Sequence, residues 1–226
     1  MKMKLNDLFS VEGKVVIVTG GSRGIGEMIA TGLVRSGVKT YICSRKEEEL
    51  LRTQEKLSKY GECIAICADL GTYNGVLDLA SKIKENEETL SILINNAGAT
   101  WGAALEDFPE KGWDKVMDLN VKALFYLTKE LLPAMQLAAT QEDPARVINI
   151  GSINGLSYSR LRNYSYSASK ASVHHLSKQM AVDLAKYNIN VNVIAPGFFP
   201  SKMTAHLLDD IKEMLQHIPR GRLGQL

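Results

Sequence analysis

The sequence predicts an α/β fold in which one domain, residues 1–226, is built on a doubly wound parallel sheet with the strand order 3-2-1-4-5-6. Short, nearly continuous apolar runs alternate with longer amphipathic stretches, the pattern of parallel strands covered on both faces by helices. Hydrophobic residues make up 45% of the chain and charged residues 23%, which is ordinary usage for a protein with a sizeable core. No repeat or low-complexity tract divides the chain, so we expect a single core.

Six apolar runs are predicted as strands, at residues 14–20, 39–44, 62–67, 91–96, 146–151 and 189–197. Helices are predicted between them, at residues 24–36, 46–59, 73–86, 113–138 and 164–187. In such sheets, ligands bind outside the carboxyl ends of the strands. The residues that follow each strand are therefore the first candidates for a functional site.

Charge excludes one class of partner. Lys and Arg number 27 against 25 Asp and Glu, a formal net charge of +2, so the chain lacks the single-sign field of a general nucleic-acid-binding protein. We therefore expect no nucleic-acid partner.

Cysteine content and hydropathy exclude several other classes. The three cysteines are an odd and small number, which argues against a disulfide framework. Cys63 and Cys67 are expected to pack within a strand, because four strand residues separate them by about 13 Å, too far to share a metal ion. His174 and His175 show no metal-ligand spacing and are interpreted as surface or packing residues. No apolar stretch approaches the roughly 20 residues of a membrane span, so we expect a cytoplasmic protein without metal or membrane partner.

A glycine-rich turn, TGGSRGIG at 19–26, follows the first predicted strand and leads directly into a helix. Glycine lets the backbone turn sharply and approach a ligand closely, and the first N–H groups of a helix attract a phosphate. The turn predicts the pyrophosphate cradle of a Rossmann-type dinucleotide site, although a plain tight turn has the same local pattern. The residues assigned to this cradle are Gly20, Ser22, Arg23, Gly24, Ile25 and Gly26.

The end of the second predicted strand indicates which dinucleotide binds. Ser44 and Arg45 stand where a carboxylate would bind the adenosine ribose of NAD. Arg23 and Arg45 are placed to clamp a 2'-phosphate together, which a guanidinium group matches well. The sequence therefore predicts NADP(H) as the cofactor. The alternative for either arginine alone is a solvated surface charge.

Tyr166 and Lys170 are four residues apart in a segment of helical pattern, so both project from one helix face. A tyrosine, whose free pKa is about 10, protonates a carbonyl near neutral pH more readily if its pKa falls by about 3 units. A lysine ammonium about 4 Å away stabilises the phenolate by about the amount that such a fall in pKa requires. Ser152, which follows the fifth strand, can donate a hydrogen bond to the same oxygen, and Asn120 lies on a preceding helix.

Six motifs occur in order along nearly the whole chain: TGGSRGIG, NNAG at 95–98, DLNVKA around Asn120, Ser152, YSASK at 166–170 and APG at 195–197. Together they resemble the short-chain dehydrogenase/reductase family. The resemblance implies that Tyr166 is the general acid/base, that Lys170 lowers its pKa and holds the nicotinamide ribose, that Ser152 polarises the carbonyl and that Asn120 anchors a water. It also implies further cofactor contacts, at Asp69, Leu70, Asn96, Ala97, Gly98, Pro196, Gly197 and Ser201.

The carboxyl-terminal part adds two expectations. Residues 198–218 follow a Gly-Pro-rich hinge and have apolar residues at helical spacing, so we expect a substrate lid; an ordinary core-packing helix is the alternative. Relatives usually continue past a segment such as 221–224 with a helix and a seventh strand. By this resemblance we expect the seventh strand to be missing, so that the sixth strand would have an unpaired edge. The resemblance makes a homodimer or homotetramer possible.

The leading functional hypothesis is an NADPH-dependent oxidoreductase that reduces a ketone to a secondary alcohol. The segments RVINIGSINGL and APGFFPSKMT, with the histidine pair, most resemble the 3-oxoacyl-acyl-carrier-protein reductases, including the rhamnolipid type. A 3-oxoacyl thioester is the substrate implied, and the apolar face of 198–218 suits its acyl chain. Two alternatives stay open: an NADP-binding protein with little turnover, and a polyol or sugar dehydrogenase on the same scaffold.

Overall fold

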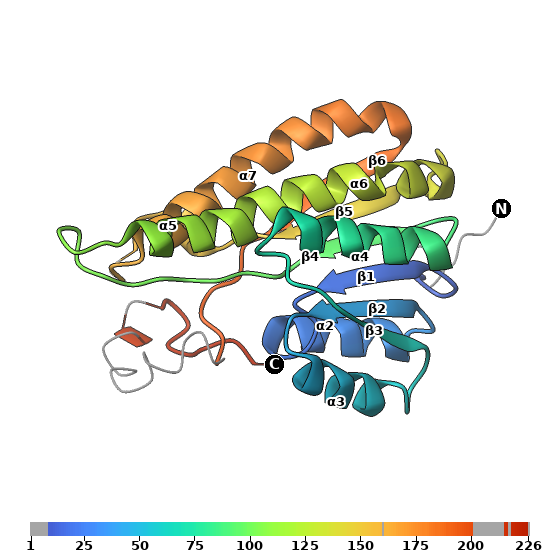
Figure 1. Cartoon of the computed structure of the whole chain (residues 1–226), viewed down its shortest axis with the longest axis horizontal. Helices are drawn as coiled ribbons and strands as arrows, with labels where there is room; N and C mark the ends of the chain where they lie inside the picture. Colours follow the sequence, from blue (N-terminus) through green and yellow to red (C-terminus); the bar gives the residue numbers. More distant parts are fainter. Residues whose placement is uncertain (1–8, 160, 201–214, 217, 226) are drawn as a thin grey trace.

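A computed structural model describes residues 9–159, 161–200, 215–216 and 218–225. Its six strands form one sheet in the order β3-β2-β1-β4-β5-β6, and every neighbouring pair is parallel (Figure 1). The predicted fold class and strand order are therefore confirmed. The strands are β1 (Val15–Thr19), β2 (Lys39–Ser44), β3 (Cys63–Cys67), β4 (Ile92–Asn95), β5 (Ala145–Ile150) and β6 (Ile189–Ile194).

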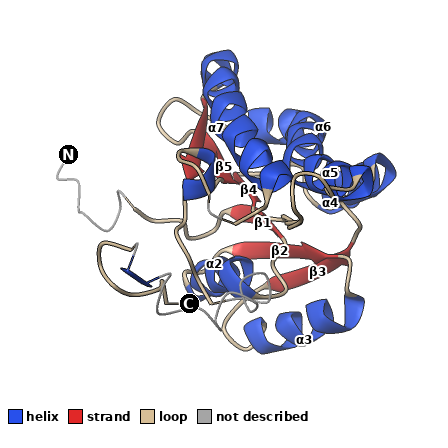
Figure 2. Ribbon diagram, turned by 90° about the vertical axis from the view of Figure 1, so that its left-hand side faces the viewer, coloured by secondary structure: helices blue, strands red, loops and turns tan. Residues whose placement is uncertain are grey.

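Helices cover both faces of the sheet (Figure 2). On β1, Val16 and Val18 pack in a buried cluster with α2 and α3, whereas Ile17 between them packs in a second cluster with α4, α6 and α7. This alternation along one strand is why the strand sequences are apolar on both faces. The helices are α2 (Gly24–Arg35), α3 (Glu47–Leu57), α4 (Tyr73–Asn86), α5 (Glu110–Met117), α6 (Ala123–Ala138) and α7 (Tyr164–Leu184).

The helix expected over residues 113–138 is interrupted. One π-helical turn, η1 (Asp118–Lys122), separates α5 from α6. Its wider hydrogen bonding is visible where Ala123 N donates to Asp118 O, five residues back. Asn120 lies inside this turn and is buried. The interruption matters for the site because π turns are rare and single ones frequently mark functional positions.

The structure bears only in part on the expectations for the two strand cysteines and for the carboxyl-terminal residues. Cys63 is buried as expected, but Cys67 is exposed because it ends the edge strand β3. The expected lid over 198–218 falls largely on residues outside those described, and so does Ser201. Within the described ranges, β6 pairs only with β5, and no helix is long and apolar enough to cross a membrane.

Candidate active site

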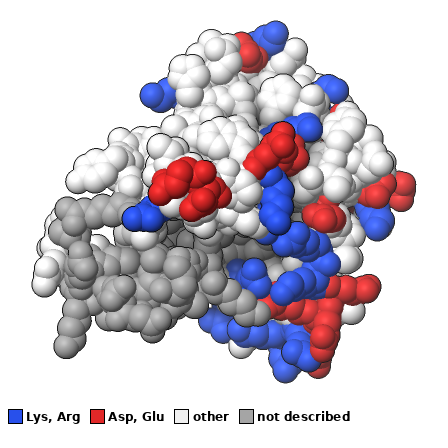
Figure 3. Space-filling view, turned by 60° about the vertical axis from the view of Figure 1, so that its left-hand side comes forward, with Lys and Arg blue, Asp and Glu red and all other residues white. Residues whose placement is uncertain are grey.

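The cofactor residues expected from the sequence are brought together around one cavity of about 440 Å³ at the carboxyl ends of the strands. On the face shown in Figure 3, Lys and Arg side chains run down the right-hand half of the view, with Asp and Glu side chains beside them. Ser152 also lines the cavity, whereas Asn120 lies behind it. The predicted residues that line it are Gly20, Ser22, Arg23, Gly24, Ile25, Gly26, Ser44, Arg45, Asp69, Leu70, Asn96, Ala97, Gly98, Ser152, Tyr166, Lys170, Pro196 and Gly197.

The glycine turn forms an open cradle against the start of α2. Gly20 and Gly24 have φ angles of +66° and +55°, a region that side chains rarely adopt. The N-cap residue, Arg23, is extended and makes no side-chain capping bond, so its side chain leaves the first N–H groups of α2 available. A Cβ on Gly26 would lie 2.2 Å from Gly20 O. The cradle therefore fits a pyrophosphate approaching the backbone closely.

We predict that Gly26→Ala destroys this cradle. The added methyl must displace the Gly20 peptide, so we expect a loss of about 1–3 kcal/mol in the free energy of unfolding and loss of NADPH binding. Gly32→Ala is the matched control, because Gly32 is exposed on the same helix and nothing lies within 4 Å of its added Cβ. That control should stabilise the protein by about 0.5–1 kcal/mol. Thermal unfolding and NADPH fluorescence titration of both variants test the prediction; equal behaviour would contradict it.

The cradle is braced by two residues of neighbouring strands. Asn96 Nδ2 donates to Thr19 O at 2.9 Å and to Gly20 O at 3.2 Å. The Thr19 hydroxyl oxygen accepts from Asn96 N at 2.9 Å and from Ala97 N at 3.0 Å. Asn96 therefore supports the glycine turn in addition to lining the cavity, and Thr19 is a supporting residue that the sequence analysis did not single out.

Three basic side chains line the cavity where it borders the glycine turn and the end of β2. Arg23 and Arg45 both line it, and Lys46 joins them there. The Arg23 guanidinium forms an ion pair of 3.2 Å with Glu49 of α3, so its orientation is fixed from a second helix. Three cations around Ser44 give the charge and donors that a 2'-phosphate requires.

The residues predicted to be catalytic, Ser152, Tyr166 and Lys170, line the same cavity. Ser152 follows β5, and its hydroxyl oxygen accepts from Asn154 N at 3.2 Å, capping a short 3-10 helix, η2 (Ile153–Gly155). Lys170 is 5% exposed, and its Nζ donates to Ile150 O at 2.6 Å. Nζ also lies 5.7 Å from the centre of the Tyr166 ring.

Burial governs the acidity of the two titratable groups. It lowers the pKa of Lys170 to about 8, so the ammonium form still predominates at neutral pH. Burial also raises the pKa of Tyr166, and its interaction with Ser152 only partly opposes this rise. The expected fall in the Tyr166 pKa is therefore not found in the protein alone, because burial disfavours the phenolate. That Lys170 lowers this pKa stays a prediction.

Comparison with known proteins identifies the family. A profile described as short chain dehydrogenase matches residues 14–212. This chain belongs to the short-chain dehydrogenase family. It is 48% identical over 224 residues to the rhamnolipids biosynthesis 3-oxoacyl-[acyl-carrier-protein] reductase of Pseudomonas aeruginosa, covering 98% of this chain and 88% of that one. It is 33% identical to gluconate 5-dehydrogenase of Gluconobacter oxydans, over 97% of this chain and 86% of that one.

A solved structure agrees with the family assignment of this dehydrogenase. The Pseudomonas aeruginosa RhlG/NADP active-site complex superposes with a TM-score of 0.93 at 49% identity, covering 96% of this chain and 86% of that one. The family resemblance inferred from the sequence motifs is confirmed.

Asn120 has a structural role in this dehydrogenase in addition to the one the resemblance implied. Its Oδ1 accepts from Ala99 N at 2.8 Å, and its Nδ2 donates to Ala99 O at 3.0 Å and to Ser169 Oγ at 2.9 Å. Ser169 in turn donates to Tyr166 O at 2.7 Å. The side chain thus ties the loop after β4 to α7. The anchoring of a water by Asn120 remains a prediction.

Several cavity residues of this dehydrogenase were not foreseen. Lys46 and Leu119 directly follow or precede predicted site residues, so adjacency was a usable signal. Glu49 had no sequence signal, because its contact with Arg23 exists only once α3 packs beside the glycine turn. Within the described residues, no three His, Cys, Asp or Glu side chains group as metal ligands. The unforeseen lining residues are Cys43, Lys46, Glu49, Ala68, Ala99, Leu119, Ile150, Gly151, Phe199 and Pro200.

Proposed function

We propose that this dehydrogenase reduces the ketone of a 3-oxoacyl thioester to a secondary alcohol with NADPH. The observation on which this depends is one cavity that joins a glycine cradle and three basic side chains at one end to Ser152, Tyr166 and Lys170 at the other. The relation to a 3-oxoacyl-[acyl-carrier-protein] reductase supports the substrate class, and the NADP complex of RhlG supports the cofactor.

The chain's own residues account for cofactor binding. The glycine turn and the first N–H groups of α2 would hold the pyrophosphate. Arg23, Arg45 and Lys46 would hold the 2'-phosphate, and Lys170 the nicotinamide ribose. When bound, NADPH supplies the hydride that reduces the carbonyl carbon.

The proton comes from the protein. Tyr166 donates its hydroxyl proton to the carbonyl oxygen, while the Ser152 hydroxyl hydrogen-bonds to the same oxygen, where negative charge grows. Because burial raises the pKa of Tyr166, its hydroxyl is protonated at neutral pH, which is the form that reduction requires. The Lys170 ammonium beside the ring stabilises the phenolate left after the transfer, which is then reprotonated from solvent.

A second candidate is oxidation or reduction of a sugar acid. It is favoured by the 33% identity to gluconate 5-dehydrogenase. The same hydride and proton chemistry would apply, with a small polyhydroxylated substrate in place of the acyl thioester. The fold alone does not separate the two candidates, so the substrate must be measured.

We predict that the chain consumes NADPH with 3-oxoacyl thioesters at neutral pH. Acetoacetyl, 3-oxooctanoyl and 3-oxodecanoyl thioesters should be compared with 5-ketogluconate at equal concentration, by the loss of NADPH absorbance. Turnover with the thioesters, and kcat/KM rising with chain length as more apolar surface is buried, is the expected result. Turnover only with 5-ketogluconate would favour the second candidate, and NADPH binding without turnover of any ketone would contradict both.

A further inference from the structure

One face of α7 presents three side chains to the end of β5. Tyr166, Lys170 and His174 follow one another at four-residue spacing, so they lie along one side of the helix. Tyr166 lines the same cavity as Ser152, and Lys170 Nζ donates to Ile150 O at 2.6 Å. His174 Nε2 lies 3.1 Å from Ser152 O. The proposed mechanism uses the first two side chains and gives the third no role.

The contact between His174 and Ser152 joins the imidazole side chain to the backbone carbonyl of Ser152. Ser152 N is also near Nε2, but at 3.5 Å that distance is at the outer limit for a hydrogen bond. We therefore assign the tautomer with a proton on Nε2, which donates to Ser152 O. The same carbonyl accepts from Gly155 N at 3.0 Å. Both of its lone pairs are thereby engaged.

The imidazole ring of His174 is closely enclosed by the segment that contains Ser152. A Cβ on Gly151 would lie 2.7 Å from Nε2, and a Cβ on Gly155 would lie 2.8 Å from Cδ2. Such distances show that the backbone packs directly against the ring with no room for a side chain. The ring therefore fixes the position of the backbone as well as donating to it.

The neighbours of Ser152 are held from the opposite side. Gly151 N donates to Ile194 O at 2.8 Å, and Ile153 N donates to Pro196 O at 3.2 Å, so both are attached to β6 and the segment that follows it. The Ser152 peptide is attached to α7 instead, through His174. The helix that bears Tyr166 and Lys170 thus also sets where the Ser152 hydroxyl lies.

We propose that His174 is a positioning residue that holds Ser152 in register with Tyr166 and Lys170; the proposal rests on the function assigned above to Ser152. In the proposed reaction, the Ser152 and Tyr166 hydroxyl groups must both reach the carbonyl oxygen of the ketone substrate. A small shift of either hydroxyl group therefore impairs both contacts. His174 acts through Ser152 and touches neither substrate nor cofactor.

The first test compares variants of His174 by steady-state kinetics. His174→Leu keeps a side chain of similar bulk and removes the donor, so we expect kcat to fall by about ten- to a hundredfold, with the Kd of NADPH unchanged. His174→Gln, whose amide nitrogen can reach the Nε2 position, should restore kcat to within about threefold of wild type. His174→Asn is too short to reach it and should not. If His174→Leu does not fold, the Gln and Asn pair decides the question.

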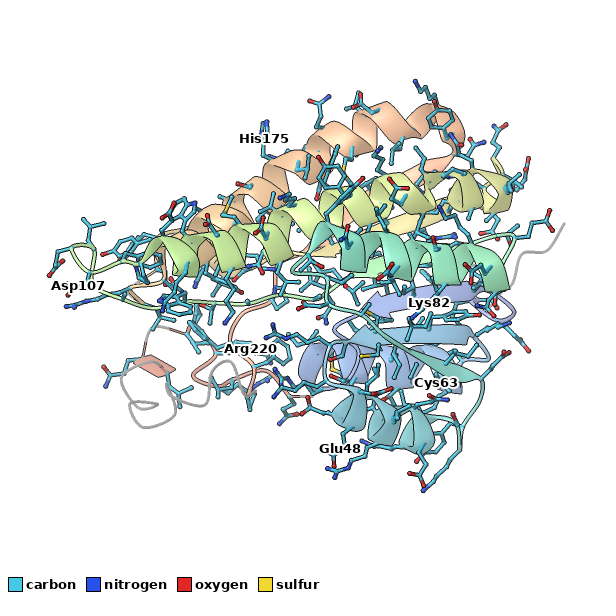
Figure 4. All side chains as sticks on the ribbon, in the orientation of Figure 1. Glu48, Cys63, Lys82, Asp107, His175 and Arg220 are labelled. Carbon is cyan, nitrogen blue, oxygen red and sulfur yellow. The ribbon has the colours of Figure 1, made fainter. Side chains whose placement is uncertain are left out.

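His175→Leu is the matched control. His175 is the next residue on α7, is exposed, and points away from the sheet (Figure 4). The same substitution there should leave kcat unchanged. A His174→Leu variant with the kcat of wild type would overturn the proposal, and so would equal kcat for His174→Gln and His174→Asn.

A double-mutant cycle separates positioning from general support of the fold. In a Ser152→Ala background, His174→Leu should lower kcat by less than about twofold, because the group that it positions is gone. A fall as large as in the wild-type background would overturn the proposal.

Hydrogen exchange gives a readout that needs no turnover. The amides of residues 151–156 should exchange faster in His174→Leu than in wild type and at the wild-type rate in His175→Leu. Unchanged exchange in both would overturn the proposal. If wild type reduces no ketone but His174→Leu still exchanges these amides faster, the proposed function would be contradicted. The positioning of the Ser152 backbone by His174 would still be supported.

Discussion

Replacing Tyr166 with Phe is expected to lower kcat by about a thousandfold while leaving the Kd of NADPH nearly unchanged. The substitution removes only the hydroxyl, which is the proton donor in the proposed reaction. The ring remains to line the cavity. Steady-state kinetics with a 3-oxoacyl thioester, and NADPH titration followed by fluorescence, measure the two quantities separately.

Tyr164→Phe is the matched control for this prediction. Tyr164 lies two residues earlier on α7, is 42% exposed and packs its ring against Phe108 at 5.8 Å, a contact that Phe preserves. Its kcat should equal that of wild type. A Tyr166→Phe variant that retains more than about a tenth of the wild-type kcat would show that another group provides the proton.

The pH dependence of the same reaction follows from the two buried groups. Lys170 loses its positive charge as the pH rises through its lowered pKa of about 8, and the stabilisation of the Tyr166 phenolate is then lost. Tyr166 itself remains protonated in this range, because burial raises its pKa. We therefore expect kcat for reduction to be constant near neutral pH and to fall above about pH 8.

Exchange of the residues at the end of β2 is expected to change cofactor preference. In the double variant Ser44→Asp with Arg45→Ala, a carboxylate replaces a hydroxyl and one cation is removed, so a 2'-phosphate is repelled and an adenosine 2'-hydroxyl gains an acceptor. We expect the ratio of kcat/KM for NADPH to that for NADH to fall by about a hundredfold or more. Kinetics with each cofactor at a fixed ketone concentration measure this ratio.

Arg52→Ala provides the control for the cofactor experiment. Arg52 lies on α3, pairs with Glu48 at 2.5 Å, and has a side chain that is 75% exposed. Arg52→Ala removes one positive charge, as Arg45→Ala does, from a residue that does not line the cavity, so the ratio should not change. An unchanged ratio in the double variant would show that Arg23 and Lys46 suffice for the 2'-phosphate.

Local pattern was enough to predict most of the fold and the arrangement of the reacting residues. The β1 sequence is apolar at its first four positions because the strand is buried on both faces, and this pattern can be read from the sequence alone. The spacing of Tyr166 and Lys170 determines that both lie on one helix face wherever the helix packs. Parallel strands then bring Ser152, at the end of β5, to the same edge as the glycine turn after β1.

Other features depend on packing that the sequence does not display. The π turn around Asn120 was missed because the apolar pattern continues through it, and the bonds of Asn120 to Ala99 and Ser169 within it join residues far apart in the sequence. The Tyr166 pKa was predicted in the wrong direction because burial of the hydroxyl was not known. His174 was interpreted as a surface or packing residue, yet it bonds to the backbone of Ser152.

The measurement that tests the central claim most directly is the stoichiometry of product formation by the wild-type protein. NADPH consumption and the 3-hydroxyacyl thioester formed from a 3-oxoacyl thioester should be quantified in the same reaction, with Tyr166→Phe in parallel. We predict one 3-hydroxyacyl product per NADPH consumed by wild type, and product formation slower by about a thousandfold in the variant. NADPH that binds to the wild-type protein but is not consumed with any ketone, or equal product formation by Tyr166→Phe, would contradict the account.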